Sequence, residues 1–184
     1  MEKEKIILGI DPGTSIMGYG IISIQKNKMY LENFDIINLK NLDNHALKLK
    51  GIFEGTLDII EQYKPDELAV EAPFYGKNVQ SMLKLGRAQG VAMAAALFKD
   101  IPIFEYSPKK IKQSITGKGN ATKEQVALML KNLLKFQEIP KHLDATDGLA
   151  VAVCHHFQSN TLTASGKYTG WKSFIKENED RISK

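Results

Sequence analysis

The order of the apolar segments limits the possible folds of this sequence more than any other feature. Residues 6 to 10 form a short apolar run that Asp11-Pro-Gly closes, which predicts a buried strand ending in a turn. Residues 18 to 24 and 29 to 39 predict two further strands, and Lys26-Asn-Lys between them has the composition of a hairpin turn. We therefore expect the chain to begin with a three-stranded antiparallel meander.

The next part of the chain alternates between helical and strand patterns. Apolar residues at helical spacing predict a helix over His45–Tyr63, and two further helices are expected over residues 80 to 98 and 144 to 156. Residues 67 to 71 and 102 to 106 predict two more strands. Strands that alternate with helices form parallel pairs joined by right-handed crossovers.

One more helix is expected from a capping-box pattern at Thr122 and Gln125, which precedes an apolar face. That face consists of Val126, Met129, Leu130, Leu133 and Leu134. The predicted fold class is thus α/β, with a mixed five-stranded sheet of three antiparallel strands followed by parallel crossovers, flanked by helices. A length of 184 residues suits one domain. We assign residues 1 to 157 to it, and the Ser-, Thr-, Asn- and Gly-rich residues 158 to 184 to a loosely structured C-terminal tail.

Positive charge is concentrated in one segment. The chain carries +4 in total, but residues 77 to 123 hold nine basic residues and two acidic ones, so this segment carries +7 and the remainder −3. The basic residues are Lys77, Lys84, Arg87, Lys99, Lys109, Lys110, Lys112, Lys118 and Lys123. Such a concentration favours a polyanionic partner, although an ordinary solvated surface remains the plainer explanation.

Membrane and secreted classes are disfavoured. The longest apolar run, residues 91 to 98, is far shorter than the roughly 18 residues of a membrane span. The apolar run that follows the charged first five residues is too short for a signal-peptide core. We expect a cytoplasmic protein with no membrane partner. The lone Cys154 cannot form an internal disulfide and is expected in the core.

Four carboxylates stand where such a sheet can bring them together. Asp11 closes the first predicted strand, Glu71 closes the fourth, and Asp144 and Asp147 stand three apart on one helical face. Functional groups gather at strand ends in α/β sheets. Clustered carboxylates repel one another, and two Mg²⁺ ions, or Mn²⁺ in their place, supply the matching charge. The pattern predicts a two-metal site that hydrolyses a phosphodiester.

Each acid also has a plainer explanation. An Asp before Pro-Gly often forms a turn, Asp144 can cap a helix, and Asp147 complements the helix dipole. Together these explanations weaken, because Glu71 lies in an apolar strand where an unpaired acid is costly. The turn at Gly13-Thr can also cradle a nucleotide phosphate, so an actin-like or sugar-kinase-like ATPase is an alternative. Those folds need two such halves, and only one is visible.

Several motifs resemble the RuvC family of Holliday-junction resolvases. They are Ile7-Leu-Gly-Ile-Asp-Pro-Gly-Thr-Ser with Gly18-Tyr-Gly, Lys84-Leu-Gly-Arg-Ala-Gln-Gly, Phe104-Glu-Tyr, Ile111-Lys-Gln and Asp144-Ala-Thr-Asp-Gly-Leu-Ala. The resemblance covers residues 5 to 157. It implies an RNase H-like fold and a homodimeric endonuclease that nicks four-way DNA junctions in symmetric pairs during recombination and repair. RuvA and RuvB are partners that it implies.

The resemblance also implies roles for residues. The family's four catalytic metal ligands are matched by Asp11, Glu71, Asp144 and Asp147. The positions expected to contact DNA are Phe74, Tyr75, Lys77, Lys112, Lys118 and Lys123. Of these, Lys112 and Lys123 match basic positions that support catalysis, and Phe74 matches an aromatic residue that packs on bases at the opened crossover. Packing of Phe74 and Tyr75 against the core is the plainer explanation. Family members often have a polar residue directly after the strand glutamate, whereas Ala72-Pro stands here, and the proline stiffens this loop.

Other features keep two explanations. The helix over residues 80 to 98 is our candidate dimer seam, but packing against the sheet explains the same pattern. The loop Gly117-Lys-Gly-Asn can close over DNA or be a plain turn. His142 is expected at the surface, and His155 and His156 near the far end of their helix. A third function is a junction-binding module without catalysis, which the presence of all four acids disfavours.

Overall fold

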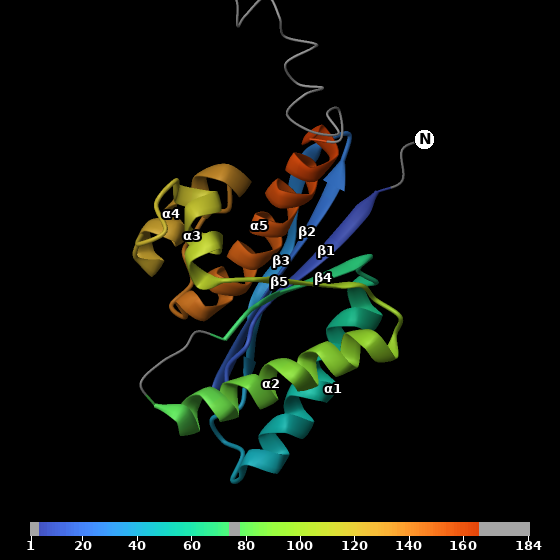
Figure 1. The fold of residues 1–184 in the computed structure, drawn as a ribbon, viewed down its shortest axis with the longest axis vertical. Coiled ribbons are helices and arrows are strands. Elements are labelled where there is room, and N and C mark those ends of the chain that lie inside the picture. Colours follow the sequence, from blue (N-terminus) through green and yellow to red (C-terminus); the bar gives the residue numbers. More distant parts are fainter. Residues whose placement is uncertain (1–3, 74–77, 166–184) are drawn as a thin grey trace, which may run out of the picture.

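A mixed five-stranded sheet forms the centre of the described part of the chain (Figure 1). The computed structural model describes residues 4 to 73 and 78 to 165, with side chains to residue 159. The strands are β1 (Lys5–Asp11), β2 (Ile16–Gln25), β3 (Lys28–Asn38), β4 (Glu67–Glu71) and β5 (Ile103–Tyr106), in the order β3-β2-β1-β4-β5. β1 pairs antiparallel with β2, and β2 with β3, whereas the β1–β4 and β4–β5 pairs are parallel. The predicted meander and parallel crossovers are confirmed.

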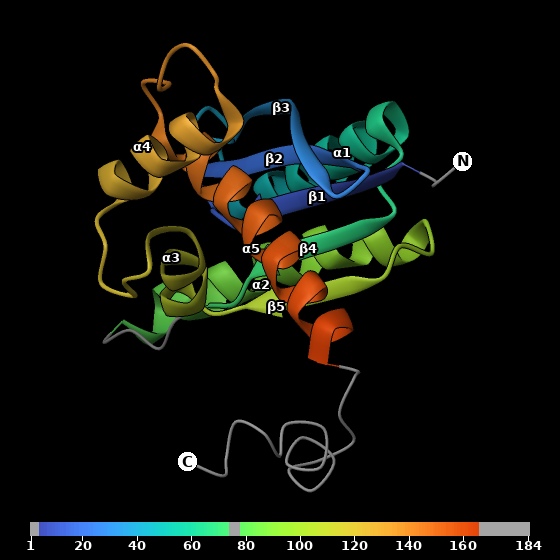
Figure 2. The same ribbon diagram turned by 90° about the horizontal axis from the view of Figure 1, so that it is seen from above.

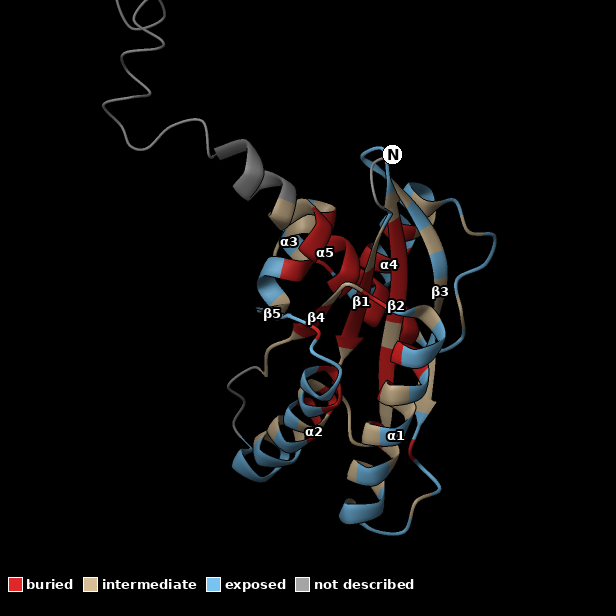
Figure 3. Ribbon diagram, turned by 90° about the vertical axis from the view of Figure 1, so that its right-hand side faces the viewer, coloured by how far each residue is buried: buried red, intermediate tan, exposed pale blue. Residues whose placement is uncertain are grey.

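Helices cover both faces of the sheet (Figures 1 and 2). One face carries α1 (His45–Tyr63) and α2 (Val79–Phe98), and the other carries α5 (Leu143–Ser165) with α3 (Pro108–Thr116) and α4 (Lys123–Leu134) beside it. Side chains alternate along a strand, so Ile7 packs in the core under α5 and Leu8 in the core under α1 and α2. Figure 3 shows buried residues concentrated in β1, β2 and α5.

The first turns of α5 lie directly on the backbone of β2. A Cβ added to Gly18 would lie 1.8 Å from the carbonyl oxygen of Asp144, and one added to Gly148 would lie 2.5 Å from the Cα of Tyr19. Real side chains do not reach such distances, so only glycine permits this approach. The contact determines how close the acids of α5 come to the end of β1.

The structure differs from the sequence-based expectation at α3, which had not been predicted. Ser107 caps this nine-residue helix by accepting from the backbone N–H of Lys110, and Pro108 occupies its first turn. Gly117 closes it in the left-handed region, with φ 76°. The helix is too short for its two buried residues, Ile111 and Ile115, to produce a periodic pattern that stands out.

Two other helices also differ from expectation. α5 runs on to Ser165, so the predicted end at residue 156 is wrong, and His155 and His156 are buried within the helix. A long buried helix extends at little cost through residues of weak helical propensity. On α4, Met129 and Leu133 were assigned to the apolar face of the helix, but they are 45% and 44% exposed, because only part of that face is covered.

Two expectations concern the C-terminal tail and the absence of a membrane span. Residues 166 to 184 of the predicted tail lie outside the described residues, and the division of the chain at residue 157 stays a prediction. Within residues 4 to 73 and 78 to 165, no helix combines the length and the apolar character that crossing a bilayer requires.

Candidate metal centre

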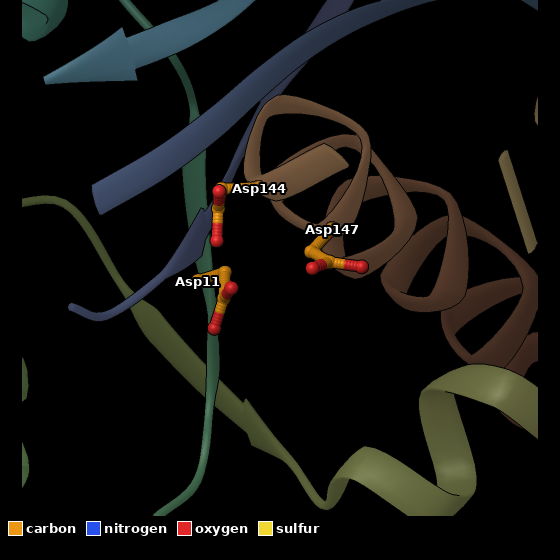
Figure 4. A group of neighbouring side chains, drawn as sticks. All are labelled: Asp11, Asp144 and Asp147. Atoms are coloured by element: carbon orange, nitrogen blue, oxygen red, sulfur yellow. The ribbon is translucent and has the colours of Figure 1, made fainter. Parts of the chain in front are cut away.

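Three aspartates meet where β1 ends and α5 begins. One carboxylate oxygen from each of Asp11, Asp144 and Asp147 lies within 4.8 Å of the other two. Figure 4 shows the three carboxyl groups facing a common space from the strand and the helix. Two oxygens that bind one Mg²⁺ from opposite sides are about 4 Å apart, so small side-chain rotations suffice to close these acids around a cation.

Glu71 joins this group from β4. Asp11, Glu71 and Asp147 line the same pocket, which has a volume of about 190 Å³. The parallel pairing of β1 with β4 aligns Ile10 with Val70, so the next residues, Asp11 and Glu71, end adjacent strands at one edge of the sheet. The structure thus brings the four predicted acids together from three distant segments.

The surroundings of these acids oppose their full ionisation. Burial, assisted by the charges of Glu71 and Asp147, raises the pKa of Asp11 well above its usual value. Burial and the charge of Asp147 raise the pKa of Glu71 to about 7. Burial also raises the pKa of Asp147, although Lys123 opposes the shift. A cation relieves this repulsion, so the acids release protons when it binds.

A lysine stands among the acids. Lys123, the first residue of α4, donates a hydrogen bond to Asp147, and its Nζ lies 3.9 Å from Oδ1 of Asp144. Burial lowers the pKa of this amine, but the hydrogen bond to Asp147 and the acidic charges outweigh burial and raise it. The predicted capping box at Thr122 and Gln125 is present, and it places Lys123 in the first turn.

Further basic residues border the pocket. Lys112 of α3 lines it, and also lines an adjoining hollow of about 500 Å³ with Lys109, Gly119 and Asn120. Part of the predicted loop at residues 117 to 120 thus lines a hollow that shares Lys112 with the acidic pocket. Lys118 in this loop is exposed, and its backbone N–H donates to Oγ1 of Thr116. Of the other residues expected to contact DNA, three lie outside the described residues: Phe74, Tyr75 and Lys77.

Two further single-residue expectations are confirmed. His142 is exposed and Cys154 is buried, as predicted. The larger hollow between β3 and the end of α4, of about 710 Å³, includes no acid among its lining residues, so its size does not make it a cation site. The positioning role of Gly18 and Gly148 had not been predicted. The signal was present in the spacing of Gly18 and Gly20, which face the helix from alternate positions of one strand.

Comparisons with known proteins match nearly the whole chain. The family model for crossover junction endodeoxyribonuclease RuvC matches residues 7–155, a span that contains the acids and lysines of the pocket. The crossover junction endodeoxyribonuclease RuvC of Cytophaga hutchinsonii is 61% identical over 97% of this chain and 88% of that protein.

The same family appears among solved structures. The structure of Thermus thermophilus RuvC is 28% identical in sequence, with a TM-score of 0.76. The superposition covers 85% of this chain and 96% of the Thermus chain. T. thermophilus RuvC in complex with a Holliday junction substrate is 29% identical, with a TM-score of 0.79, and the superposition covers 86% of this chain and 97% of the Thermus chain. These similarities, together with the sheet topology, confirm the predicted RNase H-like fold.

Proposed function

Because the chain belongs to the RuvC family of crossover junction endodeoxyribonucleases, we propose that it cuts DNA strands at its acidic pocket. Its substrate is the four-way Holliday junction, which it resolves by paired, symmetric nicks during recombination and repair. The convergence of Asp11, Asp144 and Asp147 within 4.8 Å, with Glu71 in the same pocket, carries this proposal. The complex of the Thermus relative with a Holliday junction supports the substrate.

Magnesium is the proposed cofactor, with two ions held by the four acids and Mn²⁺ able to replace them. The donors fit this assignment, because they are hard oxygen ligands whose pKa values are raised by burial and by their mutual repulsion, and a bound cation favours their charged forms. When bound, the ions supply the positive charge that orients the attacking water and stabilises the leaving oxygen.

The chain's own side chains complete the site. Lys123 offsets part of the acidic charge, and Lys112 on the pocket wall can pair with a phosphate as a point charge. Ile111 and Val126 line the same pocket and keep bulk water from its inner wall. Lys118 extends the basic surface along the DNA, and Phe74, Tyr75 and Lys77, which follow β4 in the sequence, are proposed to contact the DNA as well.

A homodimer is the proposed working unit, because two-fold symmetry places one active site on each of two opposed strands. α2 is the candidate seam. Its Ala88 and Ala92 pack in the core under the sheet, as the plainer explanation predicted, but Leu83, Leu97 and Phe98 are 51%, 60% and 69% exposed. RuvA and RuvB, implied by the family, are further proposed partners, and the cytoplasm is the proposed location.

The direct test compares a synthetic four-way junction with a linear duplex of the same sequence, each with Mg²⁺ or with a chelator. We expect symmetric nicks in the junction alone, and only with the cation. Junction binding without cutting in Mg²⁺ or Mn²⁺ would instead favour the non-catalytic module. The ATPase alternative loses its support through the match of residues 7–155 to a nuclease family, and thermal stabilisation by nucleotide is the result that would revive it.

A further inference from the structure

Gln89 of α2 contacts the strand end that carries Glu71. We propose that Gln89 is a positioning residue for the metal centre, which holds the main chain at Glu71 and so fixes where the Glu71 carboxylate stands. This inference rests on the proposed function, because it concerns the same cation site.

Gln89 makes two hydrogen bonds from one buried amide. The residue is 7% exposed, and its Nε2 lies 2.8 Å from Oε2 of Glu105 on β5 and 3.4 Å from the carbonyl oxygen of Glu71. Both partners are acceptors, so the amino group rather than the amide oxygen must face them. The two bonds use both amide hydrogens and leave the side chain one orientation.

The burial of Gln89 is costly unless these bonds are made. The other buried residues of α2 are Ala88, Ala92, Ala95 and Ala96, so Gln89 is the long polar side chain on a face of small apolar ones. An amide removed from water without a hydrogen-bond partner destabilises a protein, because the hydrogen bonds that it makes to water are lost and not replaced. Core packing alone would be served by an apolar residue, which indicates that the contact with β4 and β5 is the reason for the amide.

At Glu71, β4 is paired with a neighbouring strand on one side only. The pairing of β4 with β1 ends at Val70, whereas the pairing with β5 continues through Glu71 and Tyr106. The N–H of Ala72 donates to the carbonyl of Tyr106 at 2.9 Å, and Pro73 then has no N–H to give. β5 therefore holds the strand end along one edge, and Gln89 holds it from α2.

The position of Glu71 matters because cation ligands tolerate little displacement. A ligand must stand within about 0.5 Å of its productive position, and loss of an outer partner typically weakens metal affinity about 10- to 100-fold. The bond from Gln89 is to the main chain rather than to the carboxylate, so we expect an effect near the lower end of that range.

The test uses the full-length protein and the variants Gln89→Met, which removes the amino group, and Gln89→Asn, which keeps it but cannot span both acceptors. Gln80→Met, at the exposed start of the same helix, is the matched control. Mn²⁺ binding to the DNA-free protein is measured by electron paramagnetic resonance. Junction cleavage against Mg²⁺ concentration, junction affinity in chelator and the melting temperature complete the set.

We expect Gln89→Met to weaken Mn²⁺ binding about tenfold and to raise the half-saturating Mg²⁺ concentration by a similar factor. Gln89→Asn should change both quantities in the same direction. In both Gln89 variants the cleavage rate at saturating Mg²⁺ and the junction affinity should stay at parental values, and Gln80→Met should match the parent in every measurement. Parental metal affinity in both Gln89 variants overturns the inference. So does a general loss of stability, junction affinity and saturating rate without a shift in metal affinity, which is the pattern of a purely structural residue.

The proposed function fails on a different result. If Asp147→Asn cleaves junctions at the parental rate, the metal centre is misassigned whatever the Gln89 variants do. If Asp147→Asn is inactive and the Gln89 variants bind metal normally, the centre stands and only the positioning role is lost.

Discussion

Lys123, at the start of α4, donates a hydrogen bond to the carboxylate of Asp147, on the first turns of α5. The same amine lies 3.9 Å from Asp144, so it is an internal counter-charge for the acid cluster. It lowers the repulsion among the acids, but it also occupies oxygens that a divalent cation needs. Cation binding and the Lys123–Asp147 contact therefore compete.

Replacing Lys123 with Met removes this competitor. We expect the DNA-free variant to bind Mn²⁺ about fivefold more tightly, because the repulsion between the Lys123 amine and the cation is removed. A fivefold change corresponds to about 1 kcal/mol. Junction cleavage should nevertheless slow, because the positive charge beside the phosphate is gone. Mn²⁺ titrations and single-turnover cleavage measure the two effects, with Lys131→Met on the same helix as the control. Weaker Mn²⁺ binding would contradict the competition.

The affinity for Mg²⁺ should rise with pH across neutrality. Burial raises the pKa of Glu71 to about 7, so protons occupy this acid below neutrality, and burial also raises the pKa values of Asp11 and Asp147. Deprotonation frees the ligands, and the half-saturating Mg²⁺ concentration for cleavage should fall as the pH increases from about 6 to about 8. A half-saturating concentration that does not change over this interval would show that the acids titrate elsewhere.

Lys112 should contribute one phosphate contact. It lines both the acidic pocket and the adjoining hollow with Lys109. Each phosphate that a lysine neutralises steepens the plot of log affinity against log salt concentration by about 0.9. Lys112→Met should therefore make that slope shallower by about one. Lys50→Met, on α1 at the opposite face of the sheet, should leave the slope unchanged. Equal slopes for parent and Lys112→Met would place Lys112 away from the DNA.

The contacts of the buried His155, which reach Glu67 at the start of β4, link the pH to the stability of the protein. Nδ1 of His155 lies 2.6 Å from the hydroxyl of Tyr106, its Nε2 lies 2.5 Å from Glu67, and its ring stacks on Phe104 with centroids 4.4 Å apart. Lys5 pairs with the same glutamate at 2.6 Å. Burial lowers the pKa of His155 below its usual 6.5, although Glu67 favours the charged ring.

His155 should therefore make the protein less stable in mild acid. The unfolded chain takes up the proton near pH 6.5 and the folded one only at lower pH, so this stability is complete above that value and is lost as the pH falls through the folded pKa. Urea unfolding at about pH 7.5 and 5.5 should show the loss, and His155→Gln should reduce it. His156 also has a pKa lowered by burial and stays in the variant, so part of the dependence should remain. An unchanged pH dependence in His155→Gln would contradict this assignment.

The sheet could be predicted from local patterns, because the apolar residues of each strand and each long helix recur at the spacing that is typical of that element. Asp11 and Glu71 could be placed together from sequence, since both end predicted strands and parallel strands end at one edge. Asp144 and Asp147 followed from helical spacing. The acid cluster was thus accessible without a structure, apart from the distances that make it a cation site.

Features that depend on contacts between elements could not be predicted. Nothing near Gln89 in the sequence indicates that its amide reaches Glu71, eighteen residues away on another element. The exposure of Met129 and Leu133 depends on how α4 lies against α5, which no pattern within α4 contains. α3 was missed although Ser107-Pro and Gly117 are ordinary start and stop signals, because its length provides too few turns for periodicity.

The central claim is that the acids meet around a divalent cation that cuts the junction, and Asp11→Asn tests it most directly. The change keeps the shape of the side chain and removes one ligand charge. Because burial raises the pKa of Asp11, the neutral variant should also be at least as stable as the parent in chelator. Measured on a four-way junction in saturating Mg²⁺, the cleavage rate should fall by about a hundredfold or more, the loss of about 3 kcal/mol of cation-supplied stabilisation, while junction affinity stays unchanged. Cleavage by Asp11→Asn at the parental rate would contradict the account.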